Sequence, residues 1–164
     1  MIKVAVLTVS DRSYRGERED TSGGAIKDMI QRSVATVTDY EIIADEKSMI
    51  KKRLISLSEK VDLVLTIGGT GLSPRDVTPD ATLEVIEREV PGITEWMRAE
   101  GLKKTPHAAL SRAVAGTRGG CLIINLPGSL KGARESLETI LPLLPHAIEV
   151  IRGETLNCGA RSDR

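Results

Sequence analysis

The stretch TIGGTGLSPRDVTPD, residues 66–80, combines the residue types that bind phosphate groups. Its glycines let backbone N–H groups crowd around an anion, because no Cβ blocks the approach; they are Gly68, Gly69 and Gly71. Arg75 can neutralise phosphate charge, and Asp76 can bind a divalent cation. The sequence therefore predicts a phosphate-binding loop between a strand and a helix.

The alternative for the glycines is a purely structural tight turn. The stretch is not a Walker A loop, because no Gly-Lys-Ser/Thr follows, and its glycine spacing does not match the dinucleotide-binding fingerprint. Thr78 is expected to cap the following helix, with Pro79 in its first position. The Arg-Asp pair immediately before this helix favours phosphate binding, since a simple turn does not need it.

A second carboxylate, Asp45, lies in a comparable place earlier in the chain. Asp45 and Asp76 each stand at or just beyond the end of a structural unit, so the fold could bring them to one rim. Both could then bind Mg²⁺, which favours carboxylate oxygens together with substrate phosphates. Alternatively, Asp45 only caps a helix that begins at Glu46, and Asp76 only leads into the next helix. The spacing leaves both interpretations open.

Other polar residues follow predicted buried strands. Ser10, Asp11 and Arg12 come directly after the first strand, although the charged run that they begin can equally be a solvated surface. Residues 21–24 open a helix and could offer N–H groups to an anion. Ser111 is expected to hydrogen-bond substrate, because one histidine four residues away does not make a catalytic triad.

These residues depend on an alternation of strands and helices. Apolar runs predict strands at residues 2–9, 36–43, 61–67, 113–116 and 121–126, of which the last two could form a hairpin or lie apart. Helices are predicted after residue 24, at 45–60, from the glycine turn to Val90, at 94–100, and after 129, the last being broken by Pro142 and Pro145. This order predicts an α/β fold, a three-layer sandwich with a mainly parallel open sheet and helices on both faces. We expect one domain at residues 1–153 and a tail at 154–164.

Composition excludes several classes of partner. The 164 residues carry 23 basic and 23 acidic side chains, which argues against a general attraction to nucleic acid or membrane surfaces. Cys121 and Cys158 give neither metal-ligand spacing nor a disulfide framework, so a reduced, cytoplasmic setting is expected. Residues 2–9 lack the features of a signal peptide, and no apolar run reaches transmembrane length.

Several motifs together resemble the MogA/MoaB family of molybdenum-cofactor biosynthesis proteins, which includes the first domain of gephyrin and the matching domain of plant Cnx proteins. They are TVSDR (8–12), DTSG (20–23), DE (45–46), the run from Gly68 to Thr82, ALSR (109–112) and NLPG (125–128). The resemblance implies a molybdopterin adenylyltransferase, in which the molybdopterin phosphate attacks the α-phosphate of Mg-ATP and pyrophosphate leaves. The alternative is a non-catalytic molybdopterin-binding or scaffold protein of the same fold.

The resemblance also implies roles for individual residues. Asp45 and Asp76 match the family's two essential aspartates and would position Mg²⁺ and the triphosphate. The other expected substrate-binding residues are Ser10, Asp11, Arg12, Ser22, Gly23, Gly68, Gly69, Thr70, Gly71, Arg75, Ser111, Pro127 and Gly128. A homotrimer is expected, with a hexamer as the alternative, and a molybdenum insertase of the MoeA type would receive the product.

A phospho-receiver domain shares the alternating layout but is rejected. It would need an acidic residue at the end of the third strand, where this chain has Gly68 and Gly69. A flavin-binding electron carrier is also disfavoured, because the chain has one Trp, two Tyr and no Phe to sandwich an isoalloxazine ring.

Overall fold

The computed structural model describes residues 1–33 and 35–154; residues 155–164 of the expected tail, Cys158 among them, lie outside the described residues. The strands are β1 (Ile2–Val9), β2 (Ala35–Ile43), β3 (Leu63–Ile67), β4 (Arg88–Glu89), β5 (Ala115–Arg118) and β6 (Cys121–Leu126). They form one sheet in the order β2-β1-β3-β6-β5-β4. β2, β1, β3 and β6 are mutually parallel, while β5 runs antiparallel to both β6 and β4.

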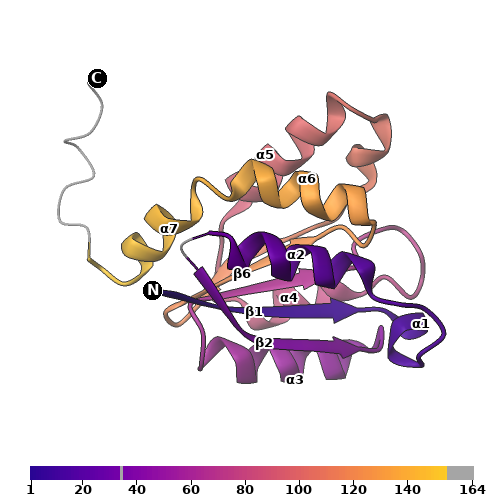
Figure 1. The fold of residues 1–164 in the computed structure, drawn as a ribbon, viewed down its shortest axis with the longest axis horizontal. Helices are drawn as coiled ribbons and strands as arrows, with labels where there is room; N and C mark the ends of the chain where they lie inside the picture. The colour runs from indigo at the N-terminus through magenta and orange to yellow at the C-terminus, as the bar shows by residue number, and fades with distance from the viewer. Residues whose placement is uncertain (34, 155–164) are drawn as a thin grey trace.

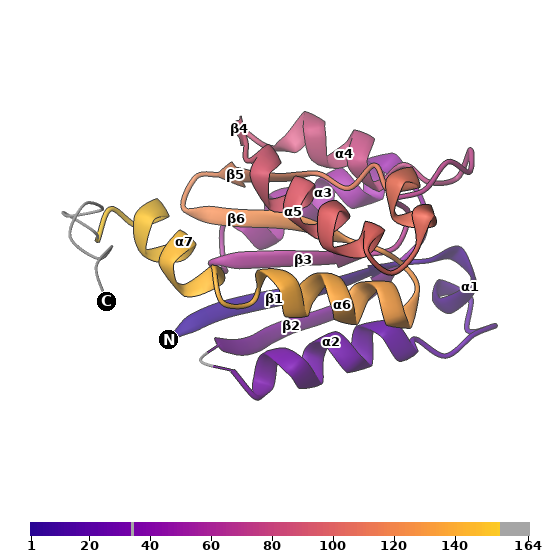
Figure 2. The same cartoon turned by 90° about the horizontal axis from the view of Figure 1, so that it is seen from above.

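Helices cover both faces of this sheet (Figures 1 and 2). They are α1 (Asp11–Tyr14), α2 (Thr21–Gln31), α3 (Lys47–Ser58), α4 (Thr78–Val85), α5 (Pro91–Leu102), the 3₁₀ helix η1 (Pro106–Leu110), α6 (Leu130–Ile140) and α7 (Leu144–Ile151). α2, α5 and α6 pack on one face, and α3 and α4 on the other. The predicted three-layer α/β sandwich is therefore confirmed.

Alternating strand residues supply the two cores. Val4 and Val6 of β1 face α2 and α6, while Ala5 and Leu7 face α3, so this strand needs apolar residues throughout. The predicted inward face of α3, made by Ile50, Leu54 and Leu57, is buried in the second core. Fully burying such a side chain contributes about 1.5–3 kcal/mol.

The helix that follows the glycine turn is shorter than predicted. It ends at Val85 instead of reaching Val90, because the next residues turn into the edge strand β4 and pair with β5. Leu83, which suggested the longer helix, is half exposed rather than inward-facing. Pro91 does not simply break a helix but begins α5, where its missing N–H costs nothing.

Of the two alternatives for the last two predicted strands, a hairpin or two separate strands, the structure shows the hairpin. β5 and β6 pair antiparallel with Arg118 opposite Cys121, and Gly119 takes a φ of 53° in the two-residue turn between them. The final helical region is split as predicted, into α6 and α7. Pro142 lies between the two helices, whereas Pro145 is accommodated in the first turn of α7.

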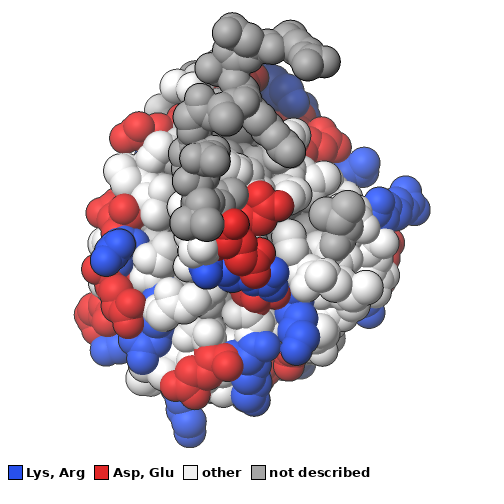
Figure 3. Space-filling model, turned by 90° about the vertical axis from the view of Figure 1, so that its left-hand side faces the viewer, with Lys and Arg blue, Asp and Glu red and all other residues white. Residues whose placement is uncertain are grey.

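The order of the strands fixes where a ligand can bind. β2 lies on one side of β1 in the sheet, and β3 lies on the other side. The connections that follow β1 and β3 therefore start next to each other at the carboxyl rim and lead away in opposite directions. This rim is on the right in Figure 1. The opposite end, shown in Figure 3, mixes acidic and basic side chains without a field of one sign. Within the described residues, no helix is both long enough and apolar enough to span a membrane.

Candidate active site

The turn after β3 has the left-handed backbone that favours glycine. Gly68 has a φ of 101° and Gly69 a φ of 67°. A Cβ on Gly68 would strike the carbonyl oxygen of Val9 at the end of β1. A Cβ on Gly128, which follows β6, would lie 3.2 Å from Gly68 Cα. The loops after β1, β3 and β6 therefore meet at this turn, as their positions in the sequence predicted.

The carbonyl and N–H groups of the turn differ in their hydrogen bonding. The carbonyls of Gly69, Thr70 and Gly71 accept hydrogen bonds from Thr78 N (3.2 Å), Arg112 N (2.9 Å) and Arg112 Nε (2.9 Å), respectively. In the described part of the chain, the N–H groups of the same three residues donate to no protein acceptor. Consecutive N–H groups left free beside satisfied carbonyls are suited to binding an anion.

These residues border a pocket of about 440 Å³ between the glycine turn, α5, η1 and α6. The pocket collects seven of the predicted site residues: Gly69, Thr70, Gly71, Asp76, Ser111, Pro127 and Gly128. Its volume lies within the range of small-molecule sites. The glycine turn, Ser111 and the loop after β6 thus share one cavity.

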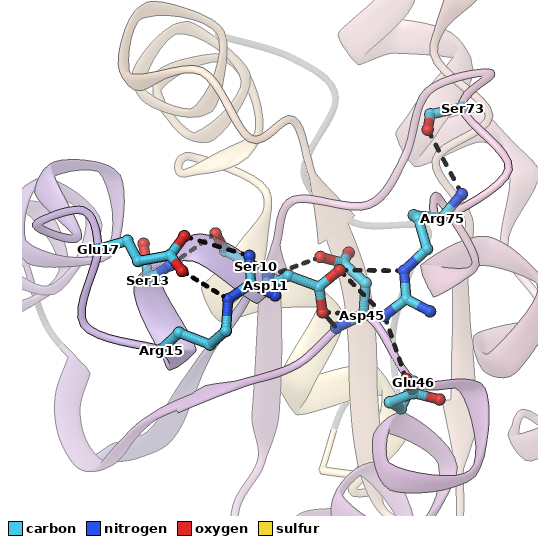
Figure 4. Close-up of polar contacts among 9 residues, drawn as sticks. All are labelled: Ser10, Asp11, Ser13, Arg15, Glu17, Asp45, Glu46, Ser73 and Arg75. Carbon is cyan, nitrogen blue, oxygen red and sulfur yellow. Dashed lines mark hydrogen bonds and ion pairs between the residues drawn. The ribbon is translucent and has the colours of Figure 1, made fainter.

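A second group of predicted residues, outside the pocket lining, follows the ends of β1 and β2 (Figure 4). Asp11 N donates to Asp45 Oδ2 at 2.8 Å, and Asp45 N donates to Asp11 Oδ1 at 3.0 Å. This reciprocal pair of hydrogen bonds ties the two loops together. It also shows that Asp45 does not cap α3, whose N-cap is Glu46 and lacks a side-chain hydrogen bond.

Arg75 reaches across to this pair from the glycine loop. Its Nε and Nη2 donate to the two carboxylate oxygens of Asp11, both at 3.0 Å, and Nη2 also contacts Glu46 at 3.1 Å (Figure 4). The guanidinium lowers the pKa of Asp11. The Arg75 side chain nevertheless remains 54% exposed.

Asp45, by contrast, has little compensation for its charge. Burial raises the pKa of the Asp45 carboxyl, and the neighbouring charges of Asp11 and Asp76 raise it further, against a lowering by the Asp11 backbone N–H and, last, by Arg75. Asp76 Oδ2 accepts one hydrogen bond, from Ser73 N at 3.0 Å. This acidic pair is suited to a divalent cation.

The donor set fits Mg²⁺ rather than a metal enclosed by protein. Among the residues that the structure describes, no three His, Cys, Asp or Glu side chains are grouped to hold a metal ion. Two carboxylates leave coordination positions for water and substrate phosphate, the arrangement that Mg²⁺ prefers.

Four of the remaining predicted residues, Ser10, Arg12, Ser22 and Gly23, lie outside the pocket lining. Ser10 Oγ caps α1 by accepting from Ser13 N, and Arg12 is exposed on that helix. The Ser22 hydroxyl donates to Gly128 O at 2.9 Å. Gly23 N donates to Asp20 Oδ1 at 2.9 Å, so this amide is already satisfied.

Known proteins are similar to this chain in sequence and in fold. A family model described as "Probable molybdopterin binding domain" matches residues 5–146. The molybdopterin adenylyltransferase of Helicobacter pylori strain J99 is 42% identical over 165 residues, covering 98% of this chain and 94% of that protein. Gephyrin of Dictyostelium discoideum is 41% identical over 92% of this chain but only 23% of its own length.

A solved structure gives the same result. The crystal structure of the molybdopterin biosynthesis enzyme MoaB from Thermus thermophilus matches with a TM-score of 0.89 and 55% identity, covering 96% of this chain and 100% of that one. The chain belongs to the MogA/MoaB family of molybdopterin-binding proteins. The resemblance inferred from the motifs is thus confirmed.

One feature of this MogA/MoaB chain corrects the predicted helix cap. The N-cap of α4 is Val77, and Thr78 occupies the first helical position. The Thr78 hydroxyl is buried and has no hydrogen-bond partner among the described residues. It lies next to Gly69, where an added Cβ would strike it and would also come within 3.2 Å of Asp45 Oδ1. The hydroxyl therefore crowds the glycine turn instead of capping the helix.

Sequence reasoning missed the wall that α5 contributes to the pocket. Arg98 lines it and donates from Nη1 to Ala113 O at 3.2 Å and from Nη2 to Thr94 Oγ1 at 3.3 Å. Thr94 and Arg98 are four residues apart, and each comes one position after a buried apolar residue, Ile93 and Met97 respectively. A polar stripe beside an apolar one on the same helix was the signal that could have revealed this wall.

Proposed function

We propose that this chain is a molybdopterin adenylyltransferase, which transfers AMP from Mg-ATP to the terminal phosphate of molybdopterin and releases pyrophosphate. The observation that carries the proposal is the glycine turn, where three consecutive free N–H groups lie beside two acidic side chains. Relatives of the MogA/MoaB family that bear this activity in their names support it, since the H. pylori protein aligns over almost the whole chain.

The pocket supplies distinct groups for the two substrates. The N–H groups of residues 69–71 would hold the triphosphate, while Gly68 lets the turn pack against the carbonyl of Val9 at the end of β1. Arg75 would add positive charge from the rim, with Asp11 holding it in place. The pterin and its phosphate would contact Ser111, Pro127 and Gly128 inside the pocket, with Ser10 and Arg12 at its edge and Ser22 and Gly23 supporting the loop after β6.

In the reaction, an oxygen of the molybdopterin phosphate forms a bond to the α-phosphorus of ATP. The bond from that phosphorus to the bridging oxygen breaks, and the electron pair leaves with pyrophosphate. No general base is needed, because a phosphate monoester is already anionic near neutral pH. The protein therefore contributes positioning and charge neutralisation, which dominate phosphoryl-type transfer.

Asp45 and Asp76 would hold Mg²⁺ beside the triphosphate. When bound, the metal supplies positive charge that offsets the charge developing on the leaving group. The two carboxylates lie close to the glycine turn, so the metal and the N–H groups would act on the same triphosphate.

We further propose that residues 1–153 form the functional unit, that the chain assembles as a homotrimer and that its adenylylated product passes to a molybdenum insertase of the MoeA type.

The decisive experiment follows the label of α-³²P-ATP into molybdopterin in the presence of Mg²⁺. Wild type should form labelled adenylyl-molybdopterin and pyrophosphate, and Asp76→Asn should lose on the order of 10²–10³ in rate with its fold intact. Asp28→Asn, which changes an exposed aspartate on α2, is the matched control and should keep wild-type turnover. Molybdopterin binding without labelled product from sound wild-type protein would overturn the proposal in favour of a scaffold.

A further inference from the structure

The segment 111–113 presents alternate side chains to opposite surroundings. Ser111 and Ala113 line the pocket, whereas Arg112 between them does not. Arg112 instead donates hydrogen bonds to the backbone of the glycine turn and of Asp76. It has no part in the reaction as described above, so its contacts need another explanation.

Those contacts join both ends of the turn. The backbone N–H of Arg112 donates to Thr70 O at 2.9 Å, Nε donates to Gly71 O at 2.9 Å, and Nη2 donates to Asp76 O at 2.6 Å. One residue therefore binds three carbonyl oxygens of a segment that is some 40 positions away in the sequence. Asp80 in the first turn of α4 lies 3.3–3.4 Å from the same guanidinium.

This bracing has a direct consequence for anion binding. A carbonyl oxygen that faced a phosphate would repel it, so a phosphate-binding turn must point its carbonyls elsewhere. Glycines alone cannot enforce this orientation, because their backbone moves freely between conformations. The planar guanidinium of Arg112 holds the carbonyl oxygens of Gly71 and Asp76 at once, and its positive charge lies next to these oxygens.

We propose that Arg112 is a positioning residue, which holds the carbonyls of Thr70, Gly71 and Asp76 away from the pocket and thereby directs the free N–H groups toward the nucleotide phosphates. The inference rests on the proposed function for the identity of the ligand. The ion pair with Asp80 is secondary, because both side chains are more than one-third exposed and such pairs contribute little.

The test compares Arg112→Lys and Arg112→Met with a matched control, Arg118→Met. Arg118 also donates to a helix-end carbonyl, Val85 O at 3.2 Å, but it lies on β5, outside the pocket lining. Binding of Mg²⁺ with α,β-methylene-ATP is measured by calorimetry, and amide hydrogen exchange is followed at Ser73, Asp76 and Thr78, whose N–H groups are hydrogen-bonded within the turn. Thermal unfolding and the split between kcat and KM for ATP are recorded in parallel.

Both Arg112 variants should weaken binding of the nucleotide analogue about tenfold or more. They should raise KM for ATP and speed exchange at the three turn amides while exchange in the sheet stays as in wild type. Lysine should not rescue, because one ammonium group cannot satisfy the same set of carbonyls in a fork. Arg118→Met should bind the analogue as wild type does.

Two results would overturn the inference. One is an Arg112→Lys variant that binds the nucleotide analogue with wild-type affinity and exchanges its turn amides at the wild-type rate. The other is amide exchange that accelerates equally in the turn and across the sheet, which would mean a general loss of stability. If wild type transfers no AMP, the proposed function fails on its own. Exchange at the turn amides then still decides whether Arg112 holds the turn.

Discussion

Replacing Gly69 with alanine tests the crowded geometry under the glycine turn. The substitution has two costs that the structure separates. First, Gly69 has a φ of 67°, and an alanine in this left-handed region costs roughly 1–2 kcal/mol. Second, the new Cβ would strike the Thr78 hydroxyl and lie 3.2 Å from Asp45 Oδ1, and overpacking of this kind costs about 1–3 kcal/mol.

Gly16 provides the matched control. It has nearly the same backbone conformation, with a φ of 74°, but a Cβ there would meet nothing within 4 Å. Gly16→Ala should therefore show the backbone cost alone, roughly 1–2 kcal/mol, and Gly69→Ala the sum, about 2–5 kcal/mol. The difference between the two variants isolates the steric clash.

Urea unfolding of both variants measures these free energies, and the AMP-transfer assay is run on the same preparations. Gly69→Ala should also lose activity, since the Cβ displaces the Asp45 carboxylate, while Gly16→Ala should keep it. Equal destabilisation by the two substitutions would refute the reasoning, because it would mean that the space behind Gly69 is not filled as described. Retained activity in Gly69→Ala would refute the link to Asp45.

Three further outcomes follow from the described contacts. Asp45→Asn should abolish transfer without lowering the melting temperature at pH 7. Because the pKa of Asp45 is raised in the folded protein, its protonation stabilises the fold at acidic pH, and this contribution is lost as the pH rises through the folded pKa. A lower melting temperature of the variant at pH 7 would contradict the assignment. Asn125→Leu should lower the free energy of unfolding by about 2–4 kcal/mol in urea titrations, because the buried Val114 N–H loses its acceptor; an unchanged value would mean that the hydrogen bond is dispensable. Burial raises the pKa of Cys121 to about 12, so in a Cys158→Ser background its thiol should react with DTNB only after unfolding, and prompt labelling of the native protein would disprove its burial.

Local sequence patterns were sufficient for most of the fold. Near-continuous apolar runs predicted the buried strands, because a parallel sheet covered on both faces leaves no position for polar alternation. The glycine turn was also predictable, since Gly68, Gly69 and Gly71 directly follow an apolar run. From these, the convergence of three loops at one rim followed from the geometry of parallel strands alone.

The contacts that organise the site could not be predicted in the same way. Asp11 and Asp45 are 34 residues apart, and their reciprocal hydrogen bonds depend on the register between β1 and β2, which no local spacing encodes. The short strand β4 was missed because edge pairing with β5 outweighed a helical pattern of apolar residues. Asn125 belongs to the NLPG motif, but the motif alone does not predict its structural role. Its buried side chain donates hydrogen bonds to Thr66 and Thr82 and so joins β6 to α4.

The site is electrostatically unbalanced in a way that matches one kind of ligand. Its acidic side, where burial and then the charges of Asp11 and Asp76 raise the pKa of Asp45, favours a cation, whereas the free N–H groups of residues 69–71 favour an anion. A metal alone would leave the N–H groups without acceptors, and a phosphate alone would lie close to uncompensated carboxylates. The proposed magnesium–triphosphate complex would satisfy both sides at once. The stability to maintain such an arrangement comes from elsewhere, from the two apolar cores on either face of the sheet.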